Sequence, residues 1–358
     1  MARASTDKAI ILLWAANLLF AAIVIPMILV KREGEELARP VAPAPNVELE
    51  EAASPDEPAL LIPVYLTGQD RVIQVPLEHY VRGVVAAEMP PDFELEALKA
   101  QAIAARTYIV RKILMRDAVQ APAPEAWVTD TVADQAYATE EQLMERWGRE
   151  DYEANIGRIN RAVAETRGLI ITYEGEPIDA TYFSTSNGFT ENSEEYWSVA
   201  IPYLRSVPSP WDKELSPRYK NVIRMSLDEV MTRLGLQAMP ASTGSKLGMA
   251  VTERTSGNRI KTMVIGGTTF SGREIREKLG LPSAEFTWRV TGDVVEFIAF
   301  GYGHGVGMSQ YGANGMAKQG SRAEEILTYY YQGVRVVPMN EIRGWQSLAL
   351  RNPERPAT

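Results

Sequence analysis

The chain has 358 residues, enough for one large domain or two ordinary ones, with a formal net charge of −9, no cysteine and two histidines. The acidic charge, without any basic patch that carries interleaved aromatic residues, argues against nucleic-acid binding. The missing cysteines exclude disulfides, thiol nucleophiles and cysteine-ligated zinc, and two histidines are too few for a histidine-rich metal site.

The N-terminal segment predicts a membrane anchor. Ala9–Val30 carries no charged residue, and about 22 helical residues rise about 33 Å, enough to cross a hydrocarbon core of about 30 Å. Lys31 and Arg32 follow directly, where a signal peptide would have a small-residue cleavage site, and this favours an uncleaved anchor. The flanking positive charges are nearly even. We expect the N-terminus inside and the bulk of the chain outside, because a short tail with one span usually inserts this way.

Composition divides the chain into four segments. Residues 1–32 are the expected cytoplasmic tail and transmembrane anchor, and 33–59, rich in Pro, Ala and Glu, are the expected disordered tether. Residues 60–340 form the expected ectodomain, and 341–358 form a C-terminal tail. The ectodomain is predicted to be mixed α+β with several β-hairpins, as one large domain or two closely packed lobes.

Hairpins and helices are both expected in the ectodomain. Alternating apolar runs around turn residues predict β-hairpins, whose turns lie at 68–70, 174–175, 266–267 and 292–293. Spacing and composition predict helices, which cover 76–88, 93–115, 140–164, 227–234, 272–279 and 321–331. Asp92 and Ser321 are the expected N-caps of the second and last of these helices. Alanines at 100, 102, 104 and 105 indicate that another helix approaches the second one closely.

Glu88 lies where helical periodicity would place a core residue. In the first helix Leu77, Val81 and Val84 recur at spacings of four and three, and Glu88 continues the same stripe. Pro90 should stop the helix just beyond this carboxyl, at the end where the macrodipole disfavours negative charge. Burial and the dipole both raise a carboxyl pKa, and this suits a general acid. The alternative is a helix-end glutamate whose side chain reaches solvent.

Arg106 is a second candidate, on the helix that follows. Its functional interpretation is a fixed cation near an acidic or polyhydroxyl ligand, and the alternative is an ordinary surface arginine. A direct pair with Glu88 would lower the pKa of Glu88 and oppose its use as a general acid.

Two loop segments add polar candidates. Residues 183–197 are rich in hydroxyl and amide side chains, which suits sugar recognition, with Tyr196 and Trp197 as stacking platforms; ordinary loops have a similar composition. In 301–313, glycines at every second position from 301 to 307 indicate that backbone is brought close to something. His304 and Gln310 in this segment are candidates for a binding cleft, and a satisfied core histidine is the alternative.

The chain resembles the stage II sporulation protein D family. Five stretches carry this resemblance in the family's order, and they are 84–90, 96–108, 183–197, 201–212 and 303–313. The resemblance implies a membrane-anchored peptidoglycan lytic transglycosylase that acts during forespore engulfment, on the mother-cell side of the sporulation septum. It cleaves glycan strands between N-acetylmuramic acid and N-acetylglucosamine and leaves 1,6-anhydro products. Stage II sporulation proteins P and M are the expected partners, and no nucleic acid is expected.

The resemblance also implies roles for individual residues. Glu88 matches the family's catalytic acid/base, Arg106 an arginine that supports activity, and Tyr203 and Arg205 a tyrosine and a basic residue implicated in activity. Seven residues are expected to line a glycan groove, and they are Arg106, Ser184, Asn187, Tyr203, Arg205, His304 and Gln310. Some relatives bind zinc through Cys and His near the equivalent of 127–137, but this chain has no such ligands there, so we predict no metal; no cofactor is expected.

Competing interpretations remain open at this point. No G-x-S-x-G motif supports a serine hydrolase, and no second carboxylate obviously accompanies Glu88, as a two-carboxylate glycosidase would need. A single carboxyl suffices for a lytic transglycosylase because the nucleophile belongs to the substrate. The main alternative is a non-catalytic glycan-binding activator of a cell-wall amidase. A further one is a membrane-tethered scaffold of the engulfment machinery.

Overall fold

A computed structural model describes residues 60–115, 123–236 and 248–345. All of them belong to one compact unit, Asn46–Thr358. The predicted anchor at 9–30 and the predicted tether lie outside the described residues. Within the described ranges, no helix is both long enough and apolar enough to cross a membrane.

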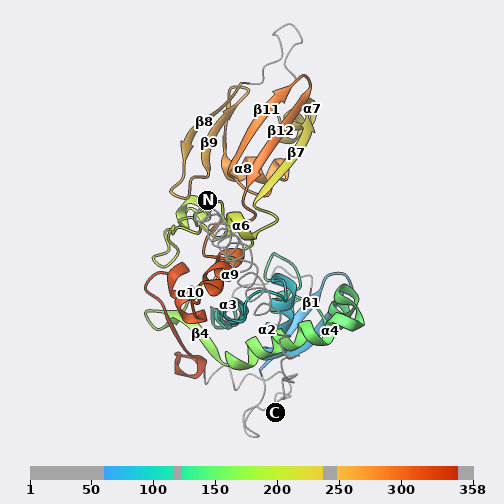
Figure 1. Cartoon of the computed structure of the whole chain (residues 1–358), viewed down its shortest axis with the longest axis vertical. Helices are drawn as coiled ribbons and strands as arrows, with labels where there is room; N and C mark the ends of the chain where they lie inside the picture. Colours follow the sequence, from blue (N-terminus) through green and yellow to red (C-terminus); the bar gives the residue numbers. More distant parts are fainter. Residues whose placement is uncertain (1–59, 116–122, 237–247, 346–358) are drawn as a thin grey trace, which may run out of the picture. The chain divides into compact units, whose positions relative to one another are not determined.

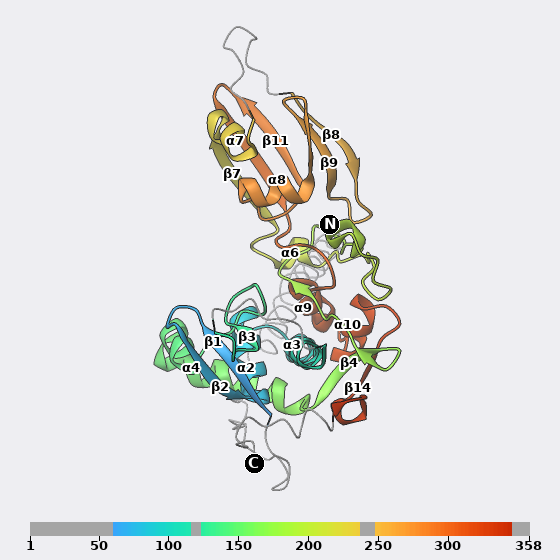
Figure 2. The ribbon, with the colours of Figure 1, turned by 180° about the vertical axis from the view of Figure 1, so that it is seen from behind.

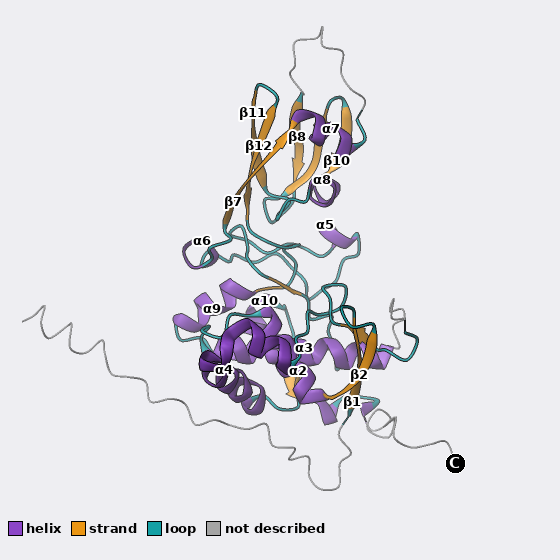
Figure 3. Ribbon diagram, turned by 90° about the vertical axis from the view of Figure 1, so that its right-hand side faces the viewer, coloured by secondary structure: helices purple, strands orange, loops and turns teal. Residues whose placement is uncertain are grey.

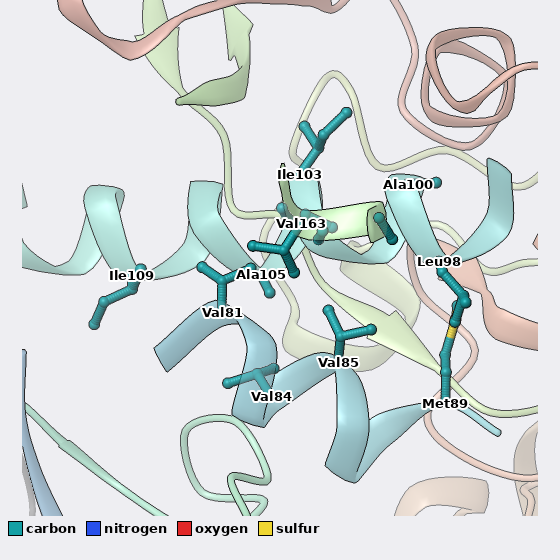
Figure 4. Packing of buried hydrophobic residues seen from close by; sticks show 14 of the residues in the cluster. Val81, Val84, Val85, Met89, Leu98, Ala100, Ile103, Ala105, Ile109 and Val163 are labelled. Atoms are coloured by element: carbon teal, nitrogen blue, oxygen red, sulfur yellow. The ribbon is translucent and has the colours of Figure 1, made fainter. Parts of the chain in front are cut away.

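Five helices build the first hydrophobic core. They are α2 (Leu77–Glu88), α3 (Leu95–Met115), α4 (Glu140–Glu165), α9 (Gln310–Lys318) and α10 (Ala323–Tyr330). Helix α3 contacts the other four (Figures 1 and 3). Val81 and Val85 of α2 point toward α3, and Val163 of α4 joins the same cluster (Figure 4). The four alanines expected at a close helix approach are buried, which confirms that prediction.

Three small sheets accompany this helical core. In the first, β1 (Leu61–Leu66) pairs antiparallel with β2 (Arg71–Pro76) and parallel with β3 (Val128–Thr129). The second has the order β14–β4–β5, with strands Arg335–Pro338, Leu169–Tyr173 and Glu176–Pro177. In the third, β6 (Tyr182–Phe183) runs parallel to β13 (Met308–Ser309), so two loop segments far apart in sequence lie side by side.

Two further sheets and two helices build the second core (Figure 2). One sheet has the order β11–β12–β7, with strands Phe286–Thr291, Val294–Phe300 and Lys220–Ser226. The other has the order β10–β9–β8, with strands Thr268–Ser271, Ile260–Ile265 and Met249–Arg254. Helices α7 (Leu227–Leu234) and α8 (Gly272–Leu279) bury Val230 and Ile275 in this core. The short elements α5 (Glu194–Trp197), α6 (Asp212–Leu215) and η2 (Met339–Glu341) lie outside it.

The mixed α+β prediction and all four hairpin turns are confirmed. Three helix starts differ from expectation. Helix α2 begins at Leu77, one residue beyond the expected start at Pro76. Helix α3 begins at Leu95, two residues beyond the expected start, and Phe93 is instead buried against the ring of Tyr311 at 4.9 Å. Helix α10 begins at Ala323, because Arg322 and not Ser321 holds the N-cap position and its backbone N–H donates to the Glu325 carboxylate at 2.7 Å.

Candidate active site

Glu88 is the last residue of α2, as the sequence predicts. Met89 leaves the helix with extended backbone angles, φ −117° and ψ 143°, in accord with the proline that follows. The Glu88 side chain is half-buried, and both of its oxygens accept a hydrogen bond. Oε1 accepts from the backbone N–H of Ala136 at 3.2 Å, and Oε2 accepts from Nε2 of Gln310 at 3.1 Å. The carboxyl therefore faces neutral donors from two distant segments and does not point into bulk solvent.

Burial raises the pKa of Glu88, and this confirms the direction expected from its place on the apolar stripe. The hydrogen bonds from Gln310 and Ala136 favour the charged form and partly oppose the effect of burial on this pKa. The carboxyl thus has an environment that favours the protonated acid, together with two donors that stabilise the carboxylate once its proton has left. A general acid that later acts as a base needs both properties.

A tyrosine–glutamine–tyrosine cluster lies beside Glu88. The hydroxyl of Tyr80 donates to Oε1 of Gln135 at 3.2 Å, and Nε2 of Gln135 donates to the hydroxyl of Tyr182 at 2.9 Å. Burial raises the pKa of both tyrosines, and the charge of Glu88 raises each of them further. These three residues were not among the sequence candidates. Tyr80 lies on the buried face of the Glu88 helix, so helical periodicity was the one available signal for the cluster.

Arg106 differs from the expectation that it faces a ligand. Its side chain has 0% exposure, and it binds Glu78 through Nε–Oε1 at 3.0 Å and Nη2–Oε2 at 2.6 Å. Nη1 donates to the carbonyl of Leu169 at 3.1 Å. The arginine therefore joins α3 to the first turn of α2 and to the start of β4, and it is neither a surface arginine nor a partner of Glu88.

Tyr203 and Arg205 are half-buried and bind other parts of the chain. The hydroxyl of Tyr203 accepts the backbone N–H of Asp179 at 2.9 Å. Arg205 forms an ion pair with Glu194 and lowers the pKa of that carboxyl to about 2. No contact between either side chain and Glu88 is found in the described ranges. Their expected contact with a glycan stays a prediction.

Ser184 and Asn187 lie in the loop that follows β6. The carbonyl of Ser184 accepts the backbone N–H of Tyr311 at 3.1 Å, which joins this loop to α9. The amide of Asn187 donates to the carbonyl of Gly257 at 2.8 Å and to the carboxylate of Glu285. Asn187 thus ties the loop to the elements of the second core, and any contact that it makes with a glycan stays a prediction.

His304 lies among the rings of Phe183, Tyr196 and Trp197, with centroid distances of 5.7, 5.6 and 5.5 Å. Nδ1 accepts the N–H of Val306 at 3.1 Å, so Nε2 carries the proton and donates to the carbonyl of Tyr182 at 3.1 Å. Burial, with a smaller contribution from the charge of Arg276, lowers the pKa of His304 to about 4. The imidazole is neutral near pH 7 and holds the backbone of Tyr182.

The alternating glycines allow the close backbone approach that their spacing predicts. All four have positive φ, between 80° and 117°. A Cβ at Gly303 would lie 2.8 Å from Cβ of Phe183. A Cβ at Gly305 would overlap the guanidinium of Arg259. A Cβ at Gly307 would overlap the carbonyl of Thr181. The segment therefore packs directly on the strand that carries Tyr182, and it continues into Gln310.

The segment 127–137 does not fit a zinc site. Asp134 forms an ion pair with Lys112 and accepts the N–H of Thr129 at 2.8 Å. Within the ranges that the structure describes, no three metal-ligating side chains are grouped.

A family model described as Stage II sporulation protein matches residues 65–173. The chain is 48% identical over 304 residues to Stage II sporulation protein D of Bacillus subtilis (strain 168), which covers 85% of each chain. It is 49% identical over 280 residues to Stage II sporulation protein D of Bacillus amyloliquefaciens, which covers 78% of this chain and 79% of that one. It is 29% identical over 302 residues to the Amidase enhancer of Bacillus subtilis (strain 168), with 71% of this chain and 39% of that one covered.

Proposed function

The chain belongs to the stage II sporulation protein D family, and on that premise we propose that it is a lytic transglycosylase that cleaves the glycan strands of peptidoglycan. The observation that carries the proposal is the Glu88 carboxyl, which is half-buried, has a raised pKa and accepts hydrogen bonds from two neutral donors. The bond to be cleaved is the β-1,4 linkage from N-acetylmuramic acid to N-acetylglucosamine.

In the proposed reaction the Glu88 carboxyl first acts as an acid. It donates its proton to the glycosidic oxygen, the bond from that oxygen to C1 of the muramic acid breaks, and positive charge develops at C1. The electron pair of the broken bond stays on the departing sugar, which leaves with a 4-hydroxyl. The new carboxylate remains hydrogen-bonded to Gln310 and Ala136, whose N–H groups favour its charged form.

The same carboxylate then acts as a base. It removes the proton from the 6-hydroxyl of the muramic acid, the oxygen forms a bond to C1, and a 1,6-anhydro ring closes without consumption of water. Glu88 regains its proton, so the cycle balances. A single acidic side chain is enough for this reaction. Within the described residues, the hydrogen-bond partners of the Glu88 carboxyl are the neutral groups of Ala136 and Gln310, and neither is a second acid.

Glu88→Gln tests the proposal because it keeps the size of the side chain and removes the proton. The full-length protein, solubilised in a mild detergent, is incubated with purified glycan strands, and the masses of the products are measured by mass spectrometry. Anhydro and hydrolytic ends differ by one water, so the mass identifies the reaction. We expect anhydro products from the wild type and from Glu150→Gln, an exposed glutamate of α4, and almost none from Glu88→Gln. Anhydro products at the wild-type rate from Glu88→Gln would refute the mechanism.

The second candidate function is activation of a cell-wall amidase without cleavage of glycan. The similarity to the Amidase enhancer favours it. The two functions differ in what the purified protein does alone on glycan strands without stem peptides. Products without a partner support the enzyme; binding without products, with a faster reaction of an added amidase, supports the activator.

Location and partners belong to the same proposal. We propose that residues 1–32 anchor the protein in the cell membrane with the ectodomain outside the cytoplasm, on the mother-cell side of the septum, where stage II sporulation proteins P and M are its partners. Protease treatment of intact protoplasts tests the orientation, because it should remove the ectodomain. Co-purification from sporulating cells with each of the two proteins tests the partnership.

A further inference from the structure

Asp212 is a buried carboxylate that the reaction does not use. It is the first residue of α6 and has 0% exposure. Oδ1 accepts the N–H of Ser186 at 2.7 Å and also the hydroxyl of Ser309, while Oδ2 accepts the hydroxyl of Ser209 at 2.8 Å. Within the described residues no Lys, Arg or His forms an ion pair with it. A buried carboxylate held only by neutral donors costs stability compared with an apolar residue, so its presence calls for a role.

The Asp212 carboxylate reaches α9 through the helix cap. Ser309 is the N-cap of α9, and its hydroxyl accepts the N–H of Gly312 at 3.3 Å while it donates to Asp212. The cap is therefore fixed from both sides, by the first turn of the helix and by the buried carboxylate. The next residue along the chain is Gln310, which is 5% exposed and donates to Glu88 at 3.1 Å.

Two glycines let α9 lie directly on the segment that carries Asp212. A Cβ at Gly312 would overlap the hydroxyls of Ser209 and Tyr330, and one at Gly315 would overlap the side chain of Trp211. The hydroxyl of Ser209 is itself within 2.9 Å of the hydroxyl of Tyr330. The first turn of α9 thus has little freedom to shift as long as the hydrogen bonds that join Asp212 to Ser209 and Ser309 are intact.

We propose that Asp212 is a positioning residue: through Ser309 it fixes the start of α9 and so holds the Gln310 amide against the Glu88 carboxyl. The proposal rests on the proposed function in one respect, namely that Glu88 is the catalytic acid. The physical statement about Gln310 and Glu88 holds whatever reaction the site performs, and it is tested without turnover.

The test follows the titration of the Glu88 carboxyl in the full-length protein. Glutamate is labelled with 13C at the side-chain carboxyl, and the Glu88 signal is identified by its loss in Glu88→Gln. Gln310→Ala should shift the midpoint upward, because the donated hydrogen bond favours the charged form. Asp212→Asn should also shift the midpoint upward. Its amide offers one acceptor oxygen in place of two, so Ser309 is held less firmly and the hydrogen bond from Gln310 to Glu88 is weakened. The double variant should shift no further than Gln310→Ala.

One control and one additional test variant separate positioning from general loss of structure. Glu191→Gln changes another buried carboxylate, which accepts hydrogen bonds from Gly257 and Thr255 and forms an ion pair with Arg259. Among the described residues it makes no hydrogen bond to α9, so the Glu88 midpoint should not move. Ser309→Ala removes the link with a smaller change, and it replaces Asp212→Asn if that variant fails to fold. We expect its Glu88 midpoint to rise as well, and each variant is checked by thermal unfolding.

The outcomes decide the proposal in both directions. An unchanged Glu88 midpoint in folded Asp212→Asn or Ser309→Ala overturns it, and so does a double variant whose shift is the sum of the two single shifts. In glycan cleavage, Asp212→Asn should lose about tenfold, and the same variant made in Gln310→Ala should lose nothing more. If the wild type cleaves no glycan, the proposed function fails, while the titration still tests the positioning role.

Discussion

The two ends of α2 each present a glutamate to the interior, and the two side chains meet opposite environments. Glu78, in the first turn, forms a two-point ion pair with the fully buried Arg106. Glu88, the last residue, meets two neutral N–H donors, and burial raises its pKa. A carboxylate matched by a cation is suited to join elements of the fold. A carboxyl without a cation is suited to gain and lose a proton.

The comparison also changes the meaning of Arg106 for activity. The guanidinium of Arg106 donates its hydrogen bonds to Glu78 and to the carbonyl of Leu169. Any support of activity by Arg106 would therefore come from fixing α2 against α3. The helix that carries Glu88 is then held at its first turn by this ion pair, and the acid lies at its opposite end. Substitutions that change one end of α2 and leave the other end intact test this difference.

The largest effect is expected at the ion pair. Arg106→Ala leaves the Glu78 carboxylate buried without its cation, so the free energy of unfolding should fall by about 3–5 kcal/mol. Denaturant unfolding of the full-length protein measures this, and Arg161→Ala, whose arginine is 45% exposed, should change the same quantity by less than about 1 kcal/mol. If Arg106→Ala kept its stability and still lost glycan cleavage, the arginine would act on the ligand and not on the fold.

At the other end of the helix the balance should reverse. Glu88→Gln should reduce glycan cleavage by about 10²- to 10⁴-fold, the usual contribution of a general acid. Its free energy of unfolding should change by less than about 1 kcal/mol, because an amide can still meet the donors nearby with one oxygen and no charge is left buried. Cleavage assays and denaturant unfolding on one preparation give both quantities. A large loss of stability in this variant would place Glu88 with Glu78 as a structural residue.

The pH dependence of stability sharpens the contrast further. Because the pKa of Glu88 is raised in the folded protein, the folded state holds this proton more tightly than the unfolded chain. The resulting stability is fully present below the ordinary glutamate pKa and is lost as pH rises through the raised pKa. The unfolding free energy of the wild type minus that of Glu88→Gln should therefore decrease across this window. Glycan cleavage should decline over its upper part, since the acid must be protonated. A difference that increases with pH would contradict a raised pKa.

The sequence predicted the features that follow from local pattern. Helical periodicity placed Glu88 at the end of a buried stripe, turn residues located the four hairpins, and alternate glycines indicated close backbone packing around His304. The partners of the acid could not be found in this way. Ala136 is 48 residues away along the chain and Gln310 is 222 residues away.

Local sequence pattern also could not show that Arg106 binds Glu78 instead of facing a ligand. Its partner Glu78 is 28 residues away on another helix, and no spacing rule within one helix relates the two. A pattern shows which face of a helix is buried, but only the packing of α2 on α3 determines which charges meet across the interface. The resemblance to a family indicated that Arg106 matters for activity without a statement of what it touches.

The smallest effect is expected at the edge of the Glu88 environment. Tyr182→Phe removes a hydroxyl that accepts from Gln135 and whose pKa is raised by burial and by the charge of Glu88, while the ring keeps its size. We expect glycan cleavage to fall by less than about tenfold, the scale of one neutral hydrogen bond, with little change in unfolding. Tyr65→Phe is the matched control, because its hydroxyl donates to the carboxylate of Asp70 at 2.7 Å and no contact of this side chain with Glu88 is found among the described residues. A loss for Tyr182→Phe as large as that for Glu88→Gln would mean that the proton comes from a shared tyrosine–glutamate unit, and the contrast between the two ends of α2 would then rest on more than one acidic group.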